Sequence, residues 1–349
     1  MADNPIRFAV IGRGWRAQFF FRLAAVLPER FTATAVMTRN PGDPVGWDLP
    51  VVADIQSLLR TEPEFVITSV PWDVNPGLVE ALAALGVPIL SETPPAPDRE
   101  GLAKLWSAVG ATGLVQVAEQ YLMLPDHAAR LAVVPLIGHR TSAQVSSTHG
   151  YHAVSMLRGF LGVGREPATV HARAFTAPLA DPLTRDGWRD DLTPRPAVTT
   201  VATVDFGGRM GLYDFTDGQW WNPLRSRRIV VRGSHGELVD DAVIHMADAR
   251  TPVTSVLRRR QTGRDLNLEG FDLDHISFDG QVVYRNPYAG ARLSDEEIAI
   301  ATILERTGRW CRDEDEAPYP LADACHDHLL SLAIDESART GATVSVTPL

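Results

Sequence analysis

Three small residues near the start of the chain have the spacing of a dinucleotide-binding turn. Gly12, Gly14 and Ala17 follow the apolar run at residues 6–11 and open a helical stretch. In such a turn the first glycine permits a tight bend, the second lets the backbone approach a pyrophosphate, and the third small residue lets the helix pack on the strand. The helix N-terminus would then face the phosphates with unpaired N–H groups. The pattern predicts a nucleotide site.

The end of the second predicted strand bears on which nicotinamide dinucleotide binds. The strand at residues 32–37 is followed by Thr38 and Arg39, where a cofactor with a free ribose 2′-hydroxyl usually meets an acidic acceptor. A guanidinium would instead pair with a 2′-phosphate, which a carboxylate would repel. We therefore predict NADP in preference to NAD. In the alternative interpretation, Arg39 is a solvated loop residue and NAD binds with its ribose edge unpaired.

The elements that must position this turn alternate between strand and helix. Apolar, strand-like runs are separated by helical stretches, and these runs lie at residues 51–54, 65–70, 87–90 and 113–118. Strands joined by single helices predict a parallel, doubly wound sheet, which binds its ligands at the carboxyl ends of the strands.

The pattern changes after this alternation. Half-buried strands then follow one another, with runs at residues 141–146, 198–206, 209–215 and 228–232. A change of class indicates a boundary, which we place near residue 122. We predict a dinucleotide-binding Rossmann domain over residues 1–122 and an α/β domain for substrate binding and oligomerisation over residues 123–349.

The composition of the 349 residues argues against several classes of protein. Hydrophobic residues make up 45 % and charged residues 22 %, which is typical of a folded globular chain. The net charge of −10, without a basic tract, argues against a nucleic-acid partner. No apolar run approaches the roughly 20 residues that span a bilayer, and the first residues do not resemble a signal peptide. Two cysteines form neither a disulfide framework nor a four-ligand zinc site. We expect a cytoplasmic protein with no membrane partner and no metal.

Taken in order, the motifs of the chain resemble those of the Gfo/Idh/MocA family of NAD(P)-dependent oxidoreductases over nearly the full length. The motifs are the glycine turn, Val70-Pro71, Glu92-Thr93-Pro94, His152 with Leu157-Arg158, residues 229–238 and the terminal helix at 322–340. The resemblance implies a Rossmann domain followed by an α/β domain with a large, mostly antiparallel, open-faced sheet. It also implies a homodimer or homotetramer formed through the open face.

The catalytic residues that the resemblance implies are retained only in part. The family would supply a lysine in a Glu-Lys-Pro tripeptide, and an aspartate four residues before a histidine. Thr93 stands at the lysine position and Thr148 at the aspartate position, whereas His152 is retained. Lys104 is the only lysine among the 33 basic residues, and its expected place on the solvated face of the next helix makes it a poor substitute.

Proton transfer must accompany hydride transfer at a carbonyl, so a titratable group is needed beside the nicotinamide. We predict His152 as the general acid/base, because its ordinary pKa of about 6.5 lets it hold or give a proton at neutral pH. Tyr121 and Tyr151 are further candidate donors, although either could be a packed tyrosine, and His152 could merely bond to substrate or backbone. His149 could also donate a proton or contact the substrate, although a structural role would explain it too. Trp221 and Arg225 are candidate substrate contacts, which a strand-end loop or a subunit contact would also explain.

The resemblance also implies a set of cofactor contacts along the sheet edge. Glu92 would bind near the nicotinamide ribose, and Asn75 stands where relatives commonly have a histidine. The predicted cofactor-binding residues are Gly12, Gly14, Trp15, Arg16, Ala17, Thr38, Arg39, Pro71, Trp72, Asn75, Glu92, Thr93 and Pro94.

The function predicted from these residues is an NAD(P)-dependent oxidoreductase. It would transfer a hydride between nicotinamide and a hydroxyl or carbonyl of a small polar substrate that resembles a sugar or cyclitol. One alternative is a nucleotide-binding regulatory protein that has lost catalysis, which loss of the lysine and aspartate would produce. Another is a lyase or glycosidase that uses bound NAD transiently and retains it.

Overall fold

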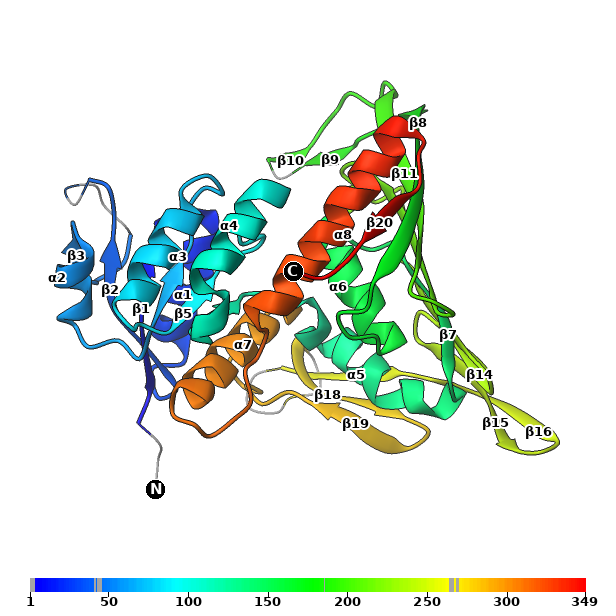
Figure 1. The fold of residues 1–349 in the computed structure, drawn as a ribbon. Helices are drawn as coiled ribbons and strands as arrows, with labels where there is room; N and C mark the ends of the chain where they lie inside the picture. Colours follow the sequence, from blue (N-terminus) through cyan, green and yellow to red (C-terminus); the bar gives the residue numbers. More distant parts are fainter. Residues whose placement is uncertain (1–3, 41, 43–45, 185, 264–266, 268–269) are drawn as a thin grey trace.

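The computed structural model describes residues 4–40, 42, 46–184, 186–263, 267 and 270–349. Its first lobe is built on a six-stranded parallel sheet with the order β3-β2-β1-β4-β5-β6 (Figure 1). The strands are β1 (Ile6–Ile11), β2 (Phe31–Met37), β3 (Val51–Val52), β4 (Phe65–Thr68), β5 (Ile89–Ser91) and β6 (Val115–Val117). The order reverses between β1 and β4, which confirms the predicted doubly wound arrangement.

This sheet forms from short apolar runs that helices cover on both faces. Phe8, Val10 and Ile67 are fully buried, as expected for parallel strands enclosed by crossover helices. The helices of this lobe are α1 (Trp15–Val26), α2 (Ile55–Leu59), α3 (Asn75–Ala84) and α4 (Arg99–Val109). Lys104 lies exposed on α4, 2.7 Å from Glu100, which confirms its predicted place on the solvated face.

The second lobe contains a nine-stranded sheet with the order β16-β15-β14-β13-β7-β12-β11-β8-β20. The pairing is antiparallel except between β7 and β12, so the sheet is mostly antiparallel, as predicted. The strands are β7 (Arg140–Val145), β8 (Ala168–Leu179), β11 (Arg195–Asp205), β12 (Met210–Thr216), β13 (Ile229–Gly233), β14 (Gly236–Val239), β15 (Ala242–Asp248), β16 (Thr251–Val256) and β20 (Val344–Val346).

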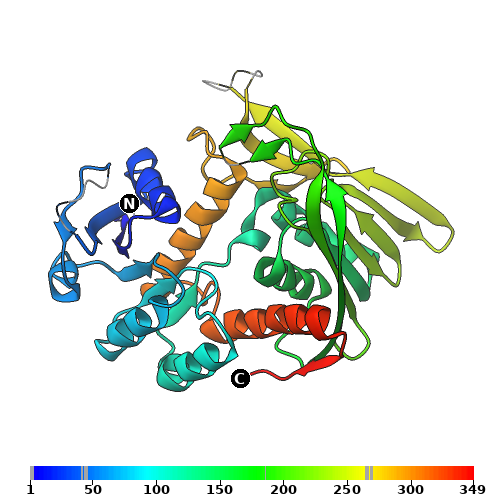
Figure 2. The same cartoon turned by 90° about the horizontal axis from the view of Figure 1, so that it is seen from above.

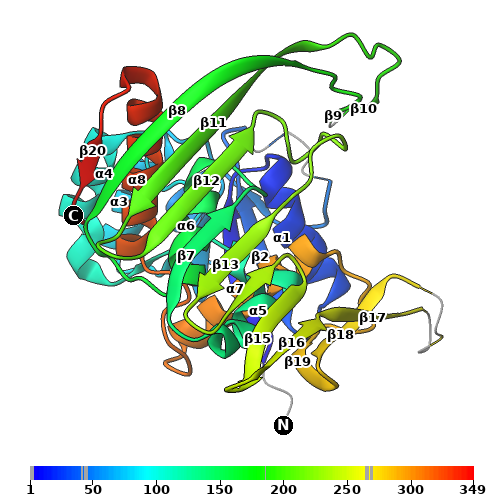
Figure 3. The same ribbon diagram turned by 90° about the vertical axis from the view of Figure 1, so that its right-hand side faces the viewer.

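Helices cover one face of the nine-stranded sheet, and the other face is open (Figure 3). Helix α6 packs on β7 and β12, and α8 packs on β8. The open face carries exposed apolar side chains, among them Phe175, Val201 and Ile244. The remaining elements are α5 (Pro125–Val133), α6 (Gly150–Leu161), α7 (Asp295–Cys311), α8 (Leu321–Thr340), a β9 (Leu183–Thr184) and β10 (Gly187–Trp188) pair, and the small sheet of β17 (Arg258–Thr262), β18 (Asp272–Phe278) and β19 (Gln281–Arg285).

Helix α7 lies between the two lobes, where it contacts α1 and α5 (Figure 2). Its first turn is fixed by a capping box in which Ser294 and Glu297 bond reciprocally. The placement brings the acidic start of α7 to the carboxyl edge of the parallel sheet. None of the helices in the described ranges is both long and apolar enough to cross a bilayer.

Candidate active site

The glycine turn has the geometry that its residues predict. Gly12 has φ +118°, and a Cβ there would lie 2.0 Å from the carbonyl oxygen of Ser69, so only glycine fits. Gly14 is the N-cap of α1, and a Cβ on it would meet nothing within 4 Å. No side chain caps α1 at Gly14, and a helix N-terminus is the end that favours a negatively charged group. Ala17, in the first turn of α1, is fully buried.

The residues predicted to bind the ribose follow β2. Thr38 is buried, and within the described part of the chain its hydroxyl has no hydrogen-bond partner. Arg39 is exposed beside it. A buried hydroxyl without a partner at a strand end is a polar group that a bound ligand could satisfy.

Three of the predicted cofactor-binding residues, Pro71, Trp72 and Asn75, lie beyond β4. Pro71 is exposed, and Trp72 has 58 % of its surface accessible. Asn75, the first residue of α3, is buried, and its amide donates to Ser91 Oγ at 2.8 Å and to the Pro95 carbonyl at 3.0 Å. Asn75 therefore holds the chain after β5 against α3.

The segment after β5 is joined to the glycine turn by an arginine. Arg16 donates to Glu92 Oε1 at 3.0 Å and to Glu296 Oε1 at 2.9 Å, which links α1, the end of β5 and the start of α7. Trp15, next to it, is 52 % exposed. Thr93 and Pro94 follow Glu92 and are joined by a cis peptide bond. Thr93 is half-buried and Pro94 is buried.

His152 lies at the start of α6 and meets a carboxylate from another element. Its Nδ1 is 2.6 Å from Oε2 of Glu119, which follows β6. The Glu119 side chain is only 1 % exposed, and its Oε1 accepts the backbone N–H of Tyr121 at 3.1 Å. Gly150, with φ +41°, begins the helix where a Cβ would lie 2.8 Å from Ser331 Oγ. This turn places His149 and His152 at the same end of α6.

Tyr121 forms one wall of the histidine site. Its ring stacks on that of His152 with centroids 4.4 Å apart, and its hydroxyl accepts a hydrogen bond from Thr148 at 3.1 Å. Burial is the main cause that raises the pKa of Tyr121, and the bond from Thr148 opposes it. Tyr121 therefore keeps its proton at neutral pH.

Tyr151 is close to His152 but enclosed. The two rings meet edge to face at 5.3 Å, and the described residues offer the Tyr151 hydroxyl no hydrogen-bond partner. Burial raises the pKa of Tyr151 well above its ordinary value. Tyr151 packs behind the imidazole rather than at an exposed surface.

A row of aromatic rings extends from His152 toward the sheet. His149 lies edge to face with His152 at 5.7 Å, Trp220 lies 4.9 Å from His149, and Phe215 stacks on Trp220 at 5.3 Å. Partial burial lowers the pKa of His149, and His152 adds to the effect. Of the predicted substrate contacts, His149 is therefore in this row; Trp221 and Arg225 are exposed on the following loop.

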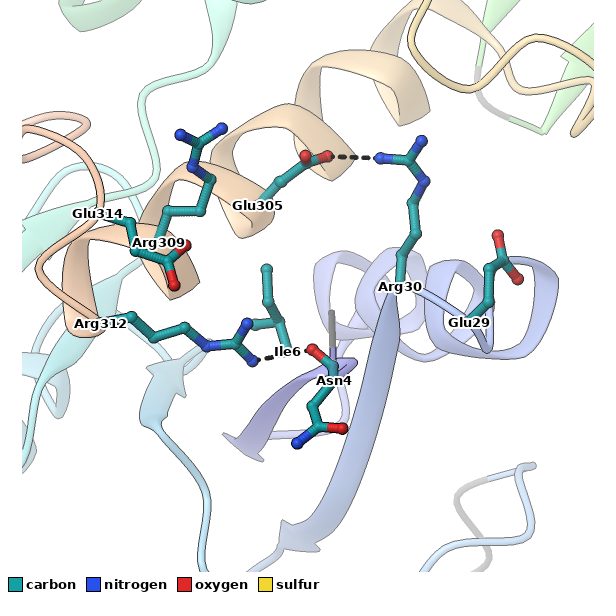
Figure 4. Close-up of a pocket in the computed structure, with 8 residues that line it drawn as sticks. All are labelled: Asn4, Ile6, Glu29, Arg30, Glu305, Arg309, Arg312 and Glu314. Carbon is teal, nitrogen blue, oxygen red and sulfur yellow. Dashed lines mark hydrogen bonds and ion pairs between the residues drawn. The ribbon is translucent and has the colours of Figure 1, made fainter. Parts of the chain in front are cut away.

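Two cavities of the structure differ in whether predicted site residues line them. One of about 300 Å³ borders Tyr121 and Ser147, and its wall includes Asp126, Arg227 and Asp295. Another, of about 420 Å³, lies between β1, the α1–β2 turn and α7, and contains none of the predicted site residues (Figure 4). There Arg30 pairs with Glu305 at 3.1 Å, a contact that ties α7 to the first lobe. Among the described residues, no group of three or more His, Cys, Asp or Glu side chains could hold a metal ion.

Glu119 is the member of this cluster that the sequence prediction missed. Glu119 stands next to Gln120-Tyr121 at a strand end, a position where a buried carboxylate is unusual and could have been noticed. The ring of Trp220 lies beside His149 and stacks on Phe215. Trp220 is adjacent to the predicted contact Trp221, and nothing in the sequence indicates which of the two tryptophans lies next to His149.

No protein-family model matches the sequence, and no curated protein was found to be similar to it. The fold is shared with solved structures. The WlbA dehydrogenase of Bordetella pertussis, in complex with NADH and UDP-GlcNAcA, has a TM-score of 0.65 and 16 % identity, covering 100 % of this chain and 99 % of that one. A myo-inositol dehydrogenase from Corynebacterium glutamicum has a TM-score of 0.66 and 16 % identity, covering 99 % and 100 %. A levoglucosan dehydrogenase in complex with NADH and L-sorbose has a TM-score of 0.68 and 18 % identity, covering 99 % and 100 %.

Proposed function

We propose that this chain is an NAD(P)-dependent oxidoreductase that transfers a hydride at a hydroxyl or carbonyl group of a small polar molecule. The observation that carries the proposal is that one sheet edge holds both halves of such a site. The glycine turn follows β1, and Tyr121 follows β6 of the same parallel sheet. Arg16 and Glu296, which meet beside the turn, are near enough to influence the pKa of Tyr121.

The residues of the turn fit a dinucleotide. Gly12 can only be glycine, the space over Gly14 is open, and the N-terminus of α1 has no side-chain cap. The backbone N–H groups at this helix start would hold the pyrophosphate. Thr38 would lie beside the adenosine ribose, and Glu92 would lie near the nicotinamide ribose. When bound, the cofactor would supply or accept the hydride.

The proton would be handled by His152. In the oxidative direction its imidazole would take the proton of the substrate hydroxyl, and in the reductive direction it would return that proton to the carbonyl oxygen. Tyr121 would donate a hydrogen bond to the same oxygen, because its hydroxyl is protonated and already accepts from Thr148. The burial of Tyr151 favours Tyr121 over it in this role.

The substrate class is inferred from the walls of the site. The rings of Trp220 and His149 offer an apolar surface beside the polar groups, which suits the C–H face of a sugar or cyclitol. Solved structures with this fold are complexes of dehydrogenases with NADH and a sugar, which supports the same class of ligands.

Two further properties belong to the proposal. Arg39 is exposed beyond β2, where it could pair with a 2′-phosphate, so we expect NADPH to bind more tightly than NADH. The exposed apolar side chains on the open sheet face, including Phe175 and Ile244, support a homodimer or homotetramer formed through that face.

A matched pair of glycine variants tests the cofactor site. We expect titration of NADPH or NADH fluorescence to show binding, and Gly14→Ala to weaken it about tenfold or more, because the added methyl group would occupy the space of the pyrophosphate. The methyl group meets no protein atom within 4 Å, so the thermal unfolding midpoint should not change. Gly164→Ala is the control, since its Cβ also meets nothing and it lies after α6.

Failure of the wild-type chain to bind either cofactor at millimolar concentration would contradict the proposal. Binding without turnover of any sugar, cyclitol or corresponding ketone would favour a regulatory protein instead.

A further inference from the structure

The carboxylate that meets His152 comes from an element on which no catalytic acid was expected. We propose that Glu119 is the positioning residue for His152: it accepts the Nδ1 proton, and so leaves the Nε2 lone pair of the imidazole to face the substrate. The inference rests on the proposed function, because it assigns a partner to the proton-handling residue named there.

Burial makes the pairing of Glu119 specific. The side chain is 1 % exposed, and its two oxygens meet His152 Nδ1 at 2.6 Å and the N–H of Tyr121 at 3.1 Å. A carboxylate removed from water needs such donors, since an unpaired buried charge is costly. In the described ranges no arginine or lysine forms an ion pair with Glu119. The imidazole of His152 is therefore the side chain with which the Glu119 carboxylate forms a hydrogen bond.

The ring of His152 is held on its other sides as well. Tyr121 stacks on one face at 4.4 Å, and His149 and Tyr151 approach at 5.7 and 5.3 Å. The titratable groups that face the imidazole are Glu119 after β6, Tyr121 just beyond it, and His149 and Tyr151 at the start of α6. Glu119 is the carboxylate among these described neighbours, so it decides which nitrogen carries the proton.

The tautomer has a chemical consequence. A neutral imidazole carries one proton, so an Nδ1–H bonded to Glu119 leaves Nε2 as an acceptor. The proton of a substrate hydroxyl then moves to Nε2, and the imidazolium that forms is stabilised by the adjacent carboxylate, as in triads in which an acid orients a histidine. In the reverse direction the same proton returns from Nε2 to the carbonyl oxygen.

Glu119 also supplies the carboxylate that the family resemblance would place at Thr148. The family resemblance would place an aspartate there, and this chain instead has a hydroxyl that bonds to Tyr121. A carboxylate is still present beside the histidine, but it is supplied from the end of β6 rather than from the turn before α6.

The tautomer can be measured without substrate or cofactor. In the full-length protein with ¹⁵N-labelled histidine, long-range ¹H–¹⁵N correlation distinguishes the two tautomers, and His152→Asn assigns the signal. We expect neutral His152 to be protonated at Nδ1. In Glu119→Gln the amide oxygen can still accept from Tyr121 N–H while the NH₂ group donates to Nδ1, so the proton should move to Nε2.

Kinetics then measure the effect on turnover. With a substrate identified, Glu119→Gln should lower kcat about 100-fold or more with little change in KM, and Glu119→Asp should recover part of the loss and restore the Nδ1–H tautomer. A wild-type His152 protonated at Nε2, or a tautomer unchanged in Glu119→Gln, would overturn the inference. Its failure is distinct from failure of the proposed function, because the tautomer is read in the absence of cofactor.

Discussion

Helices α5 and α6 each hold a histidine beside a charged side chain, and the two charges are opposite. On α5, Arg130 donates from Nη1 to Nδ1 of the buried His127 at 2.9 Å. On α6, Nδ1 of His152 meets the carboxylate of Glu119 at 2.6 Å. The same ring nitrogen therefore faces a cation in one region and an anion in the other.

The difference is consistent with a structural role for His127 and with the proton-transfer role proposed for His152. At His127 the lone pair of Nδ1 is occupied by an arginine, and burial together with Arg130 lowers the pKa of the imidazole to about 3. That ring stays neutral at ordinary pH. At His152 the carboxylate of Glu119 can accept the Nδ1 proton, which would leave the Nε2 lone pair for a substrate proton. The partner, rather than the histidine, marks the site.

Exchange of the two histidines for asparagine gives the largest expected contrast in activity. We expect His152→Asn to lower kcat by about 10²–10⁴-fold, since that is the range lost when a general acid or base is removed. His127→Asn should change kcat by less than about threefold, because the buried ring of His127 bonds to Arg130 rather than to Glu119. Steady-state absorbance of the reduced cofactor measures both rates. Equal losses of kcat in the two variants would contradict the different roles assigned to the two histidines.

The free energy of unfolding should depend on pH through His127. The pKa of His127 is about 3 in the folded chain and about 6.5 when unfolded, so its contribution is fully present above pH 6.5 and is lost as the pH falls toward 3. Between pH 7 and pH 5 the loss is about 2 kcal/mol of unfolding free energy.

Urea unfolding at these two pH values measures that loss. In His127→Leu the difference between the two unfolding free energies should shrink by about 2 kcal/mol, whatever the starting stability of the variant. An unchanged difference would show that His127 is not held neutral by the fold.

Tyr121→Phe tests the smallest effect. It removes the hydroxyl proposed to bond the substrate oxygen while keeping the ring that stacks on His152. We expect kcat to fall about tenfold, because that loss corresponds to one hydrogen bond that stabilises the transition state. Tyr213→Phe is a matched control, because its hydroxyl accepts the N–H of Gly150. If Tyr121→Phe retained full kcat, Tyr121 would be only a wall of the site.

The fold of the first lobe could be predicted from sequence because most of its determinants are local. Gly12, Gly14 and Ala17 follow one strand directly, and Gly12 has the positive φ that a tight turn there requires. The alternation of runs around them was equally sufficient to predict the doubly wound order of the parallel sheet.

The proton-handling half depends on contacts that the sequence does not specify. Glu119 and His152 are separated by 33 positions and belong to different lobes, so only the packing of α6 against the end of β6 brings them together. Strand β8 was also missed, although exposed His171 and Arg173 alternate with buried Val170 and Ala172 as in a half-buried strand.

The most direct test of the account is transfer of deuterium from the cofactor. The protein would be incubated with NADPH or NADH carrying deuterium at C4 of the nicotinamide and with a panel of keto-sugars and keto-cyclitols, and the products analysed by mass spectrometry. We predict that the wild-type chain places one deuterium on the carbinol carbon of a product, and that His152→Asn yields little or none in the same time. Tight cofactor binding with no label in any product, or equal labelling by the two proteins, would contradict the assignment.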